Sequence, residues 1–233
     1  MQPFDEAHQI RDEPQAKAAT GTAIAALSKM RRSGLPAAGG RGRFPGMSLV
    51  LASASPRRRD LLLRAGLDFE VVVSPAEEIH DPAMAPDRLC EGNALLKVAA
   101  VAHLHQQATI IGADTLVFID AEALGKPADM AAARAMLRRL SGRTHTVCTG
   151  VCVMRPGGET LTFHELSEVV FRTLDDAAID AYFQLVDPLD KAGAYGIQEH
   201  GEWIVEEIRG SFDNVMGLPL ARLLEVLAAP SDL

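Results

Sequence analysis

Short apolar segments alternate with helical ones from Ser48 onward, and this alternation restricts the possible folds most. The strand-like stretches of the first half are "SLVLA" (48–52), "DFEVVVS" (68–74) and "TIIGADTLVFID" (109–120). Helical patterns come after them or between them, at 56–65, 87–105 and 128–140. Alternation of this kind is typical of an α/β sheet covered by helices.

The second half adds two strand patterns in succession. "THTVCTGVCVM" (144–154) and "TLTFHELSEVVFR" (160–172) are joined by "RPGGE", which indicates a hairpin. Asp175 is a suitable N-cap for a helix over 176–185, and a last helix runs from about Pro219 to Leu227. We therefore predict a long twisted mixed sheet flanked by helices on both sides, with two lobes and a central cleft.

Two local features of this prediction can be checked directly. Gly112 to Asp114 break the apolar pattern of the central strand, so we expect the strand to be interrupted there. In the helix over 87–105, the apolar stripe is expected to consist of Leu89, Leu96, Ala99 and Ala100.

The first 46 residues differ from the remainder. They show no strand pattern and no strongly periodic helix, and their acidic residues do not suit a signal or transit peptide. We expect a flexible extension over 1–46 and one folded domain over 47–233, which is long enough to bury its own core.

Charge and cysteine content narrow the partners and the compartment. The net charge of −8 argues against a protein that binds nucleic acid or an acidic membrane. The three cysteines are few and odd in number, which suits the reducing cytoplasm. No apolar run is long enough to span a bilayer. A small anionic ligand is the expected partner.

Three cations crowd the start of the first helix. Ser55 and Pro56 are good N-cap and N1 residues, but Arg57, Arg58 and Arg59 follow immediately. The helix dipole is already positive there, so each cation should cost about 0.3–1 kcal/mol. One reading is a solvated charge cluster paired with Asp60. The other is a phosphate site built from the helix N-terminus, the arginines and the hydroxyls of Ser53 and Ser55.

Asp114 lies inside an otherwise apolar strand, directly after "GA". A buried carboxylate needs a partner, so it either caps backbone N–H groups or binds a metal and activates water. Glu77 and Glu78, at the end of the second strand, can supply another carboxylate. Two carboxylates together with phosphate oxygens would suit Mg²⁺.

Two lysines and a small-residue loop complete the candidates. Lys97 lies among apolar residues of a helix, and Lys126 precedes a proline, which holds it in an extended loop. Each can instead be a solvated or snorkelling side chain. In "DKAGAYGIQ" (190–198), small residues surround Lys191 and Tyr195, and Gln198 carries both a donor and an acceptor for a pyrimidine edge. A tight structural turn is the alternative.

Six motifs in order resemble those of the Maf family of nucleoside triphosphate pyrophosphatases, from Ser48 to about Leu227. They are "SASPRRRDLL", "GADT", "LGKP", "LSGRTHTVCTG", "DKAGAYGIQ" and "GSFDNVMGLPL". The resemblance implies a fold like that of inosine triphosphate pyrophosphatases. It also implies hydrolysis of a nucleoside triphosphate to the monophosphate and pyrophosphate, with Mg²⁺ or Mn²⁺ as cofactor, by a homodimer.

The resemblance also implies roles for particular residues. Asp114 is the catalytic acid of the family, and Asp114 and Glu78 are its metal ligands. The residues implied to bind substrate are Ser53, Ser55, Arg57, Arg58, Lys97, Thr115, Lys126 and Gln198.

The wording of two motifs indicates the substrate. Thr115 after the catalytic Asp, together with "YGIQ", is similar to the group acting on dTTP and UTP, in which Arg57, Thr115 and Gln198 match the specificity positions. The other group of the family acts on 7-methyl-GTP and is one alternative. A nucleotide-binding regulator of septum formation is another.

Overall fold

The computed structural model describes residue 44, residues 46–120 and residues 122–230. The extension expected over 1–46 therefore lies almost entirely outside the described residues. In the described part, no helix is long and apolar enough to cross a membrane.

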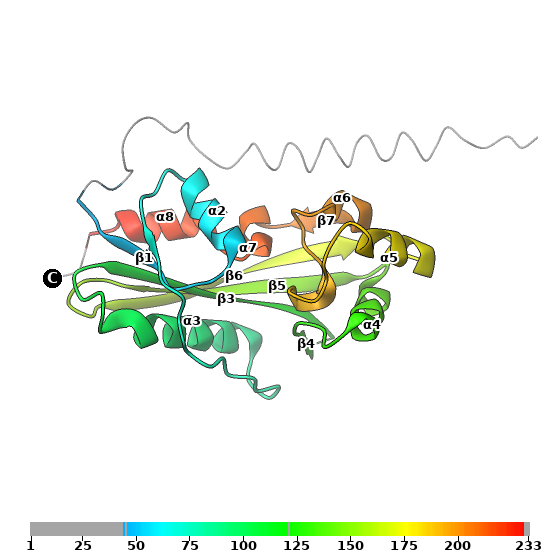
Figure 1. The fold of residues 1–233 in the computed structure, drawn as a ribbon, viewed down its shortest axis with the longest axis horizontal. Helices are drawn as coiled ribbons and strands as arrows, with labels where there is room; N and C mark the ends of the chain where they lie inside the picture. The colour runs from blue at the N-terminus through cyan, green and yellow to red at the C-terminus, as the bar shows by residue number, and fades with distance from the viewer. Residues whose placement is uncertain (1–43, 45, 121, 231–233) are drawn as a thin grey trace, which may run out of the picture.

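In this part of the chain, seven strands form one mixed sheet, in the order β2-β1-β3-β5-β6-β7 with β4 beside β3 (Figure 1). β1 pairs in parallel with β2 and β3, and the other pairs are antiparallel. The strands are β1 (Leu49–Leu51), β2 (Glu70–Val71), β3 (Thr109–Ile119), β4 (Glu122–Leu124), β5 (Thr144–Met154), β6 (Thr160–Phe171) and β7 (Val205–Arg209). The predicted mixed α/β sheet is confirmed, although the strand expected over 68–74 has only two residues.

Helices cover both faces of the sheet. α3 packs on one face, while α2, α7 and α8 lie on the other, and α4 and α5 gather at the end of the sheet near β4 (Figure 1). The helices are α2 (Pro56–Arg64), α3 (Pro86–Ala102), α4 (Met130–Leu140), α5 (Asp176–Phe183), α6 (Gly201–Ile204), α7 (Phe212–Met216) and α8 (Leu220–Ala228), with a 3₁₀ turn η1 (Ala192–Ala194). The larger core lies on the face opposite α3.

β3 is continuous, so the predicted interruption at Gly112–Asp114 is wrong. Gly112 serves helix packing instead, because a Cβ there would lie 2.6 Å from the Ala94 carbonyl oxygen. A Cβ at Gly150 of β5 would lie 2.4 Å from the Cys90 carbonyl carbon. The two glycines therefore let the backbone of α3 approach the sheet closely.

The buried stripe of α3 also differs from the prediction. Leu96 and Ala99 are exposed, whereas Cys90, Ala94 and Val98 are buried with the correctly predicted Leu89. The buried stripe is the side of the helix that packs on the sheet, where the backbone of Ala94 and Cys90 lies close to Gly112 and Gly150.

One edge of β3 is unpaired at its centre. β1 pairs with Thr109–Ile111 and β4 with Val117–Ile119, while β5 pairs along the other edge from Ile110 to Phe118. Among the described residues, positions 112–116 thus have a strand neighbour on one side only. Asp114 and Thr115 lie on this open edge.

Candidate active site

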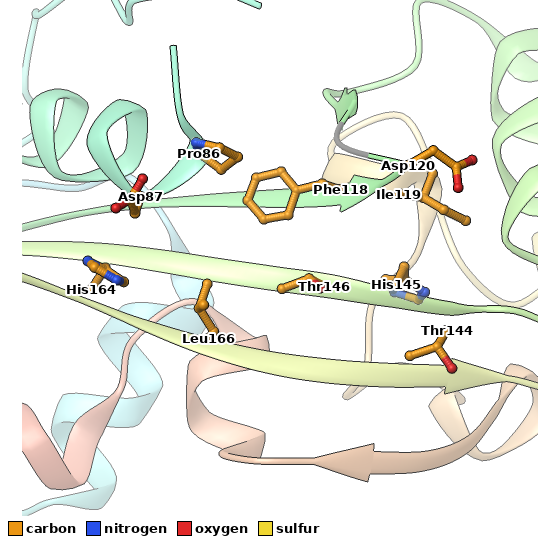
Figure 2. A pocket seen from close by; sticks show the side chains of 10 residues that line it. All are labelled: Pro86, Asp87, Phe118, Ile119, Asp120, Thr144, His145, Thr146, His164 and Leu166. Carbon is orange, nitrogen blue, oxygen red and sulfur yellow. The ribbon is translucent and has the colours of Figure 1, made fainter.

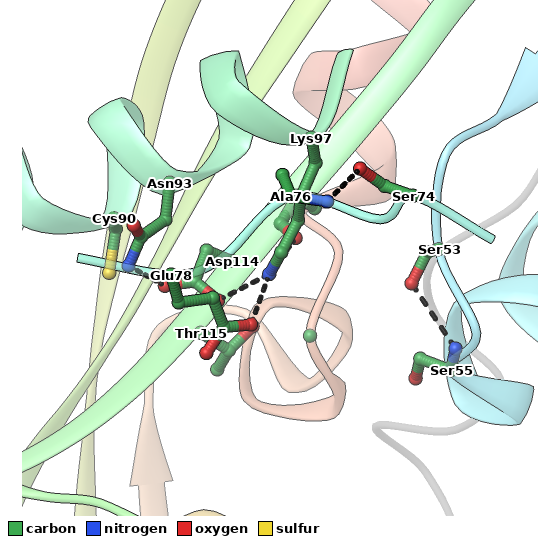
Figure 3. A network of polar contacts seen from close by, with 12 residues as sticks. Ser53, Ser55, Ser74, Ala76, Glu78, Cys90, Asn93, Lys97, Asp114 and Thr115 are labelled. Carbon is green, nitrogen blue, oxygen red and sulfur yellow. Dashed lines mark hydrogen bonds and ion pairs between the residues drawn. The ribbon is translucent and has the colours of Figure 1, made fainter. Parts of the chain in front are cut away.

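Three charged side chains meet at the open edge of β3. Lys97 Nζ lies 2.7 Å from Asp114 Oδ1 and 2.7 Å from Glu78 Oε1, and it donates to the Ala113 carbonyl at 3.3 Å (Figure 3). Asn93 Nδ2 donates to Asp114 Oδ2 at 3.1 Å. We call Glu78, Asn93, Lys97 and Asp114 the Asp114 cluster.

Helix α3 positions half of this cluster. Asn93 and Lys97 are four residues apart and so lie on the same face of the helix. Asn93 also holds the segment that carries Glu78, because its side chain accepts from Ile79 N at 2.7 Å and donates to Ile79 O at 3.2 Å. Sequence analysis missed Asn93. The sequence signal for Asn93 is its position, one helical turn before Lys97 and on the same face of the helix.

The charges of the Asp114 cluster determine what it can bind. Asp114 is only 5% exposed, and both of its oxygens already accept hydrogen bonds. The lysine ammonium spends its three donors on Asp114, Glu78 and a backbone carbonyl, and so cancels one of the two negative charges. The arrangement leaves a net negative site that can attract a cation or take a proton from water.

The carboxylates of Asp114 and Glu78 could bind a hard cation whose remaining ligands are other oxygen atoms. The two carboxylate oxygens closest to Lys97 share one nitrogen at 2.7 Å, so twice that distance is their largest separation. Within the described residues, no three His, Cys, Asp or Glu side chains gather to form a metal site by themselves. Mg²⁺ is commonly held by one or two carboxylates with phosphate oxygens and waters, which matches Asp114 and Glu78.

Arg58 is turned into the protein. It is buried and donates from Nε to Gly217 O at 2.8 Å, from Nη1 to Ser53 Oγ at 3.1 Å and from Nη2 to Thr115 Oγ1 at 3.0 Å. Burial lowers the pKa of Arg58, and the Asp114 carboxylate opposes this shift. Three of its five N–H donors are thus engaged by the protein, which sequence reasoning did not anticipate.

The start of α2 retains free donors. Ser55 is the N-cap residue, but its side chain makes no capping hydrogen bond, and Arg57 beside it is half-buried. Ser53 Oγ accepts from Ser55 N and from Arg58, so its own proton remains available (Figure 3). Arg59 is exposed and lies 3.7 Å from Asp60, so the solvated-pair reading applies to that arginine.

Lys126 and Gln198 lie in two neighbouring loops. Gly193 N donates to Gly125 O at 3.1 Å, which joins the "LGKP" loop to the 3₁₀ turn that precedes Gln198. Lys126 is exposed and forms no ion pair with any other described residue, and Gln198 is half-buried. Both residues lie in loops, whereas Asp114 lies on β3 and Asn93 and Lys97 lie on α3.

The contacts of Lys191 fit the alternative that its loop is a tight structural turn. It is 3% exposed, and its Nζ contacts Asp187 O at 2.7 Å, Asp190 Oδ1 at 2.6 Å and Glu199 Oε2 at 3.1 Å. A Cβ at Gly196 would lie 2.8 Å from Lys191 Cε, so that glycine makes room for the lysine. The ammonium therefore ties the loop together.

A pocket of about 340 Å³ opens on the α3 face of the sheet, at the N-terminus of that helix (Figure 2). It is lined by Pro86, Asp87, Phe118, Ile119, Asp120, Thr144, His145, Thr146, His164 and Leu166. None of the site residues predicted from the sequence is among them. The four residues of the Asp114 cluster do not line this pocket either.

Comparisons with known proteins agree with the motifs. The family model described as "Maf-like protein" matches residues 48–229. A dTTP/UTP pyrophosphatase of Akkermansia muciniphila is 49% identical over 179 residues, which cover 77% of this chain and 94% of that protein. One from Bacillus cytotoxicus is 47% identical and covers 76% and 93%.

Among solved structures, the Ham1 protein of Staphylococcus aureus matches with a TM-score of 0.45 and 17% identity, over 77% of this chain and 97% of that one. A dITP/XTP pyrophosphatase from Mycobacterium abscessus matches with a TM-score of 0.38 and 19% identity, over 55% and 76%. On the family model and the sequence relatives, this chain belongs to the Maf family.

Proposed function

We propose that this chain hydrolyses dTTP and UTP to the nucleoside monophosphate and pyrophosphate. The names of its relatives support this substrate class. The observation that carries the proposal is the Asp114 cluster at the open edge of β3, where Thr115, the residue after Asp114, accepts a hydrogen bond from Arg58 in the first turn of α2. A carboxylate with a fixed lysine next to free anion donors is what attack of water on a phosphate requires.

Asp114 is the proposed general base. It accepts a proton from a water molecule whose oxygen forms a bond to the α-phosphorus, while the bond from that phosphorus to the bridging oxygen breaks. Lys97 and Asn93 fix the carboxylate, so little reorganisation is needed during the step. Pyrophosphate leaves with the electron pair of the broken bond.

Positive groups receive the phosphates. Phosphate oxygens are proposed to be bound by the N-terminus of α2, Ser53, Ser55, Arg57 and Lys126, which would explain why Arg57 stands at the positive end of a helix. We propose that Arg58 acts through Ser53 and Thr115, to which it donates.

Asp114 and Glu78 are proposed to hold Mg²⁺ or Mn²⁺, whose chemistry when bound is to neutralise phosphate charge and polarise the phosphorus. Lys97 now lies between the two carboxylates, so its ammonium must share them with the ion. Calorimetric titration of the protein with Mn²⁺ should give a site that is lost in Glu78→Gln.

Thr115 and Gln198, with Arg57, are proposed to select the base.

We further propose that the protein is a cytoplasmic homodimer and that it does not bind nucleic acid. All three cysteines are free and buried, which suits a reducing compartment, and the net charge is −8. Light scattering on the purified protein measures the oligomeric state.

The deciding experiment measures turnover of dTTP, UTP, CTP, GTP and 7-methyl-GTP with Mg²⁺, and separates the products by ion exchange. Monophosphate and pyrophosphate from dTTP and UTP are expected. Asp114→Asn should lower kcat by at least about 100-fold, whereas Asp68→Asn, an exposed control, should not. Turnover of 7-methyl-GTP alone would replace the substrate assignment. Absence of all turnover would favour a binding role in regulating septum formation.

A further inference from the structure

A chain of hydrogen bonds runs from Arg58 through two threonines to the backbone of α7. Arg58 Nη2 lies 3.0 Å from Thr115 Oγ1, which lies 3.0 Å from Thr149 Oγ1. Thr149 Oγ1 lies 2.9 Å from the carbonyl oxygen of Asn214. The chain connects the four elements α2, β3, β5 and α7.

The two ends of this chain fix the direction of every proton in it. A carbonyl only accepts, so the single hydroxyl proton of Thr149 goes to Asn214 O. Thr149 must then accept from Thr115, which uses the single proton of Thr115. Arg58 only donates, so it occupies one of the two lone pairs of Thr115. Thr115 Oγ1 has one lone pair left and no proton to give.

The inner end of the chain is rigid. Thr149 and Asn214 are both fully buried. The Asn214 amide donates to Val147 O at 3.2 Å and to Ser167 Oγ at 2.9 Å, which holds the backbone of α7 in place. The proton of Thr149 therefore cannot turn to solvent as an alternative.

The outer end of the chain is accessible. Thr115 is half-buried and lies on the open edge of β3 next to Asp114. Gly217 lies beside it, and a Cβ there would be 3.3 Å from Thr115 Oγ1. Because Gly217 has no side chain, the neighbourhood of the free lone pair stays open.

We propose that Thr149, acting through Thr115, determines which bases the enzyme accepts. Thr149 is a positioning residue that makes Thr115 an acceptor only. An acceptor matches the N3–H of uracil and thymine and repels the bare N3 of cytosine. Guanine also carries an N–H at N1, so an acceptor at Thr115 does not by itself exclude guanine, and other contacts must do so. The inference rests on the proposed function and on Thr115 facing the base.

The test compares kcat/KM for dTTP and dCTP in wild type, Thr149→Val and Thr149→Ser. Valine removes the acceptor for the Thr115 proton, which can then point to the base while Arg58 still donates to Thr115. The ratio of kcat/KM for dTTP to that for dCTP should fall about three- to tenfold, the effect of one hydrogen bond. Serine keeps the hydroxyl and should keep the ratio.

A general loss of stability would lower both rates but leave their ratio unchanged, so an unchanged ratio in folded Thr149→Val overturns the proposal. Should that variant fail to fold, Thr115→Ala tests the same proton direction. It should lower kcat/KM for dTTP and leave that for dCTP equal or higher; a loss confined to dCTP would contradict the proposal. Wild-type enzyme that turns over neither dTTP nor UTP would instead refute the proposed function.

Discussion

Replacing His145 by glutamine tests how strongly the folded core excludes charge. His145 is 2% exposed, its Nε2 lies 2.7 Å from the Tyr195 hydroxyl oxygen, and its Nδ1 has no hydrogen-bond partner among the residues that the structure describes. Its ring makes edge contacts with Phe171 and Tyr195. Burial lowers the pKa of His145 from 6.5 to about 4. The folded protein therefore holds the imidazole neutral.

The sign and size of the effect follow from this shift. Below pH 6.5 the unfolded chain binds a proton that the folded chain refuses, so stability falls as the pH drops towards 4. At about pH 4.5 the wild type should have lost about 2.5 kcal/mol of its unfolding free energy through this group alone. For a domain of this size that corresponds to about 5–10 °C in Tm.

Urea unfolding followed by circular dichroism measures the effect, at about pH 7.5 and about pH 4.5. Glutamine can hydrogen-bond to Tyr195 and does not titrate. The unfolding free energy of the wild type minus that of His145→Gln should therefore be about 2.5 kcal/mol smaller at the lower pH. Titrations of other groups occur in both proteins and cancel. Equal pH dependence of the two proteins would refute the reasoning.

Four further substitutions probe packing, charge and helix capping. Gly150→Ala places a methyl group 2.4 Å from the α3 backbone and should cost about 1–3 kcal/mol in urea unfolding and lower kcat. Gly92→Ala, on α3 itself, meets nothing closer than 3.8 Å and should gain up to about 1 kcal/mol; equal losses in both would contradict the close approach. Lys97→Met leaves the buried Asp114 carboxylate without its cation and should cost about 3–5 kcal/mol in thermal unfolding; unchanged Tm would contradict the pairing. Asp129→Ala removes the N-cap of α4, which accepts from a backbone N–H at 2.8 Å, and should cost about 1 kcal/mol without changing kcat/KM.

The sequence predicted the larger elements well because their signals are local. The N-cap residue Asp175, and the glycine-containing hairpin "RPGGE", mark boundaries that the structure places within two or three residues. Short elements such as β4, β7 and α7 were missed. They are too short to show a period, and their neighbours in the sheet or core stabilise them.

The glycine at the centre of β3 was misread because its role is tertiary. A glycine in an apolar strand predicts an interruption when only neighbours in sequence are considered. The approach of α3, whose Ala94 carbonyl would lie 2.6 Å from a Cβ at Gly112, became visible only in the fold. The same approach determines which side of α3 is buried.

Sequence by itself determined that the chain forms a mixed sheet with helices, and that arginines, lysines and carboxylates recur in a fixed order along it. Tertiary structure alone decided which of them are in contact. Adjacent strand residues face opposite sides, so Asp114 meets α3 while Thr115 meets Arg58 of α2. Arg58, expected to bind phosphate, is turned inward and donates to Gly217 O, Ser53 Oγ and Thr115 Oγ1. Such contacts join residues far apart in sequence, and their geometry depends on strand register and on the closeness of helix packing, which no local pattern encodes.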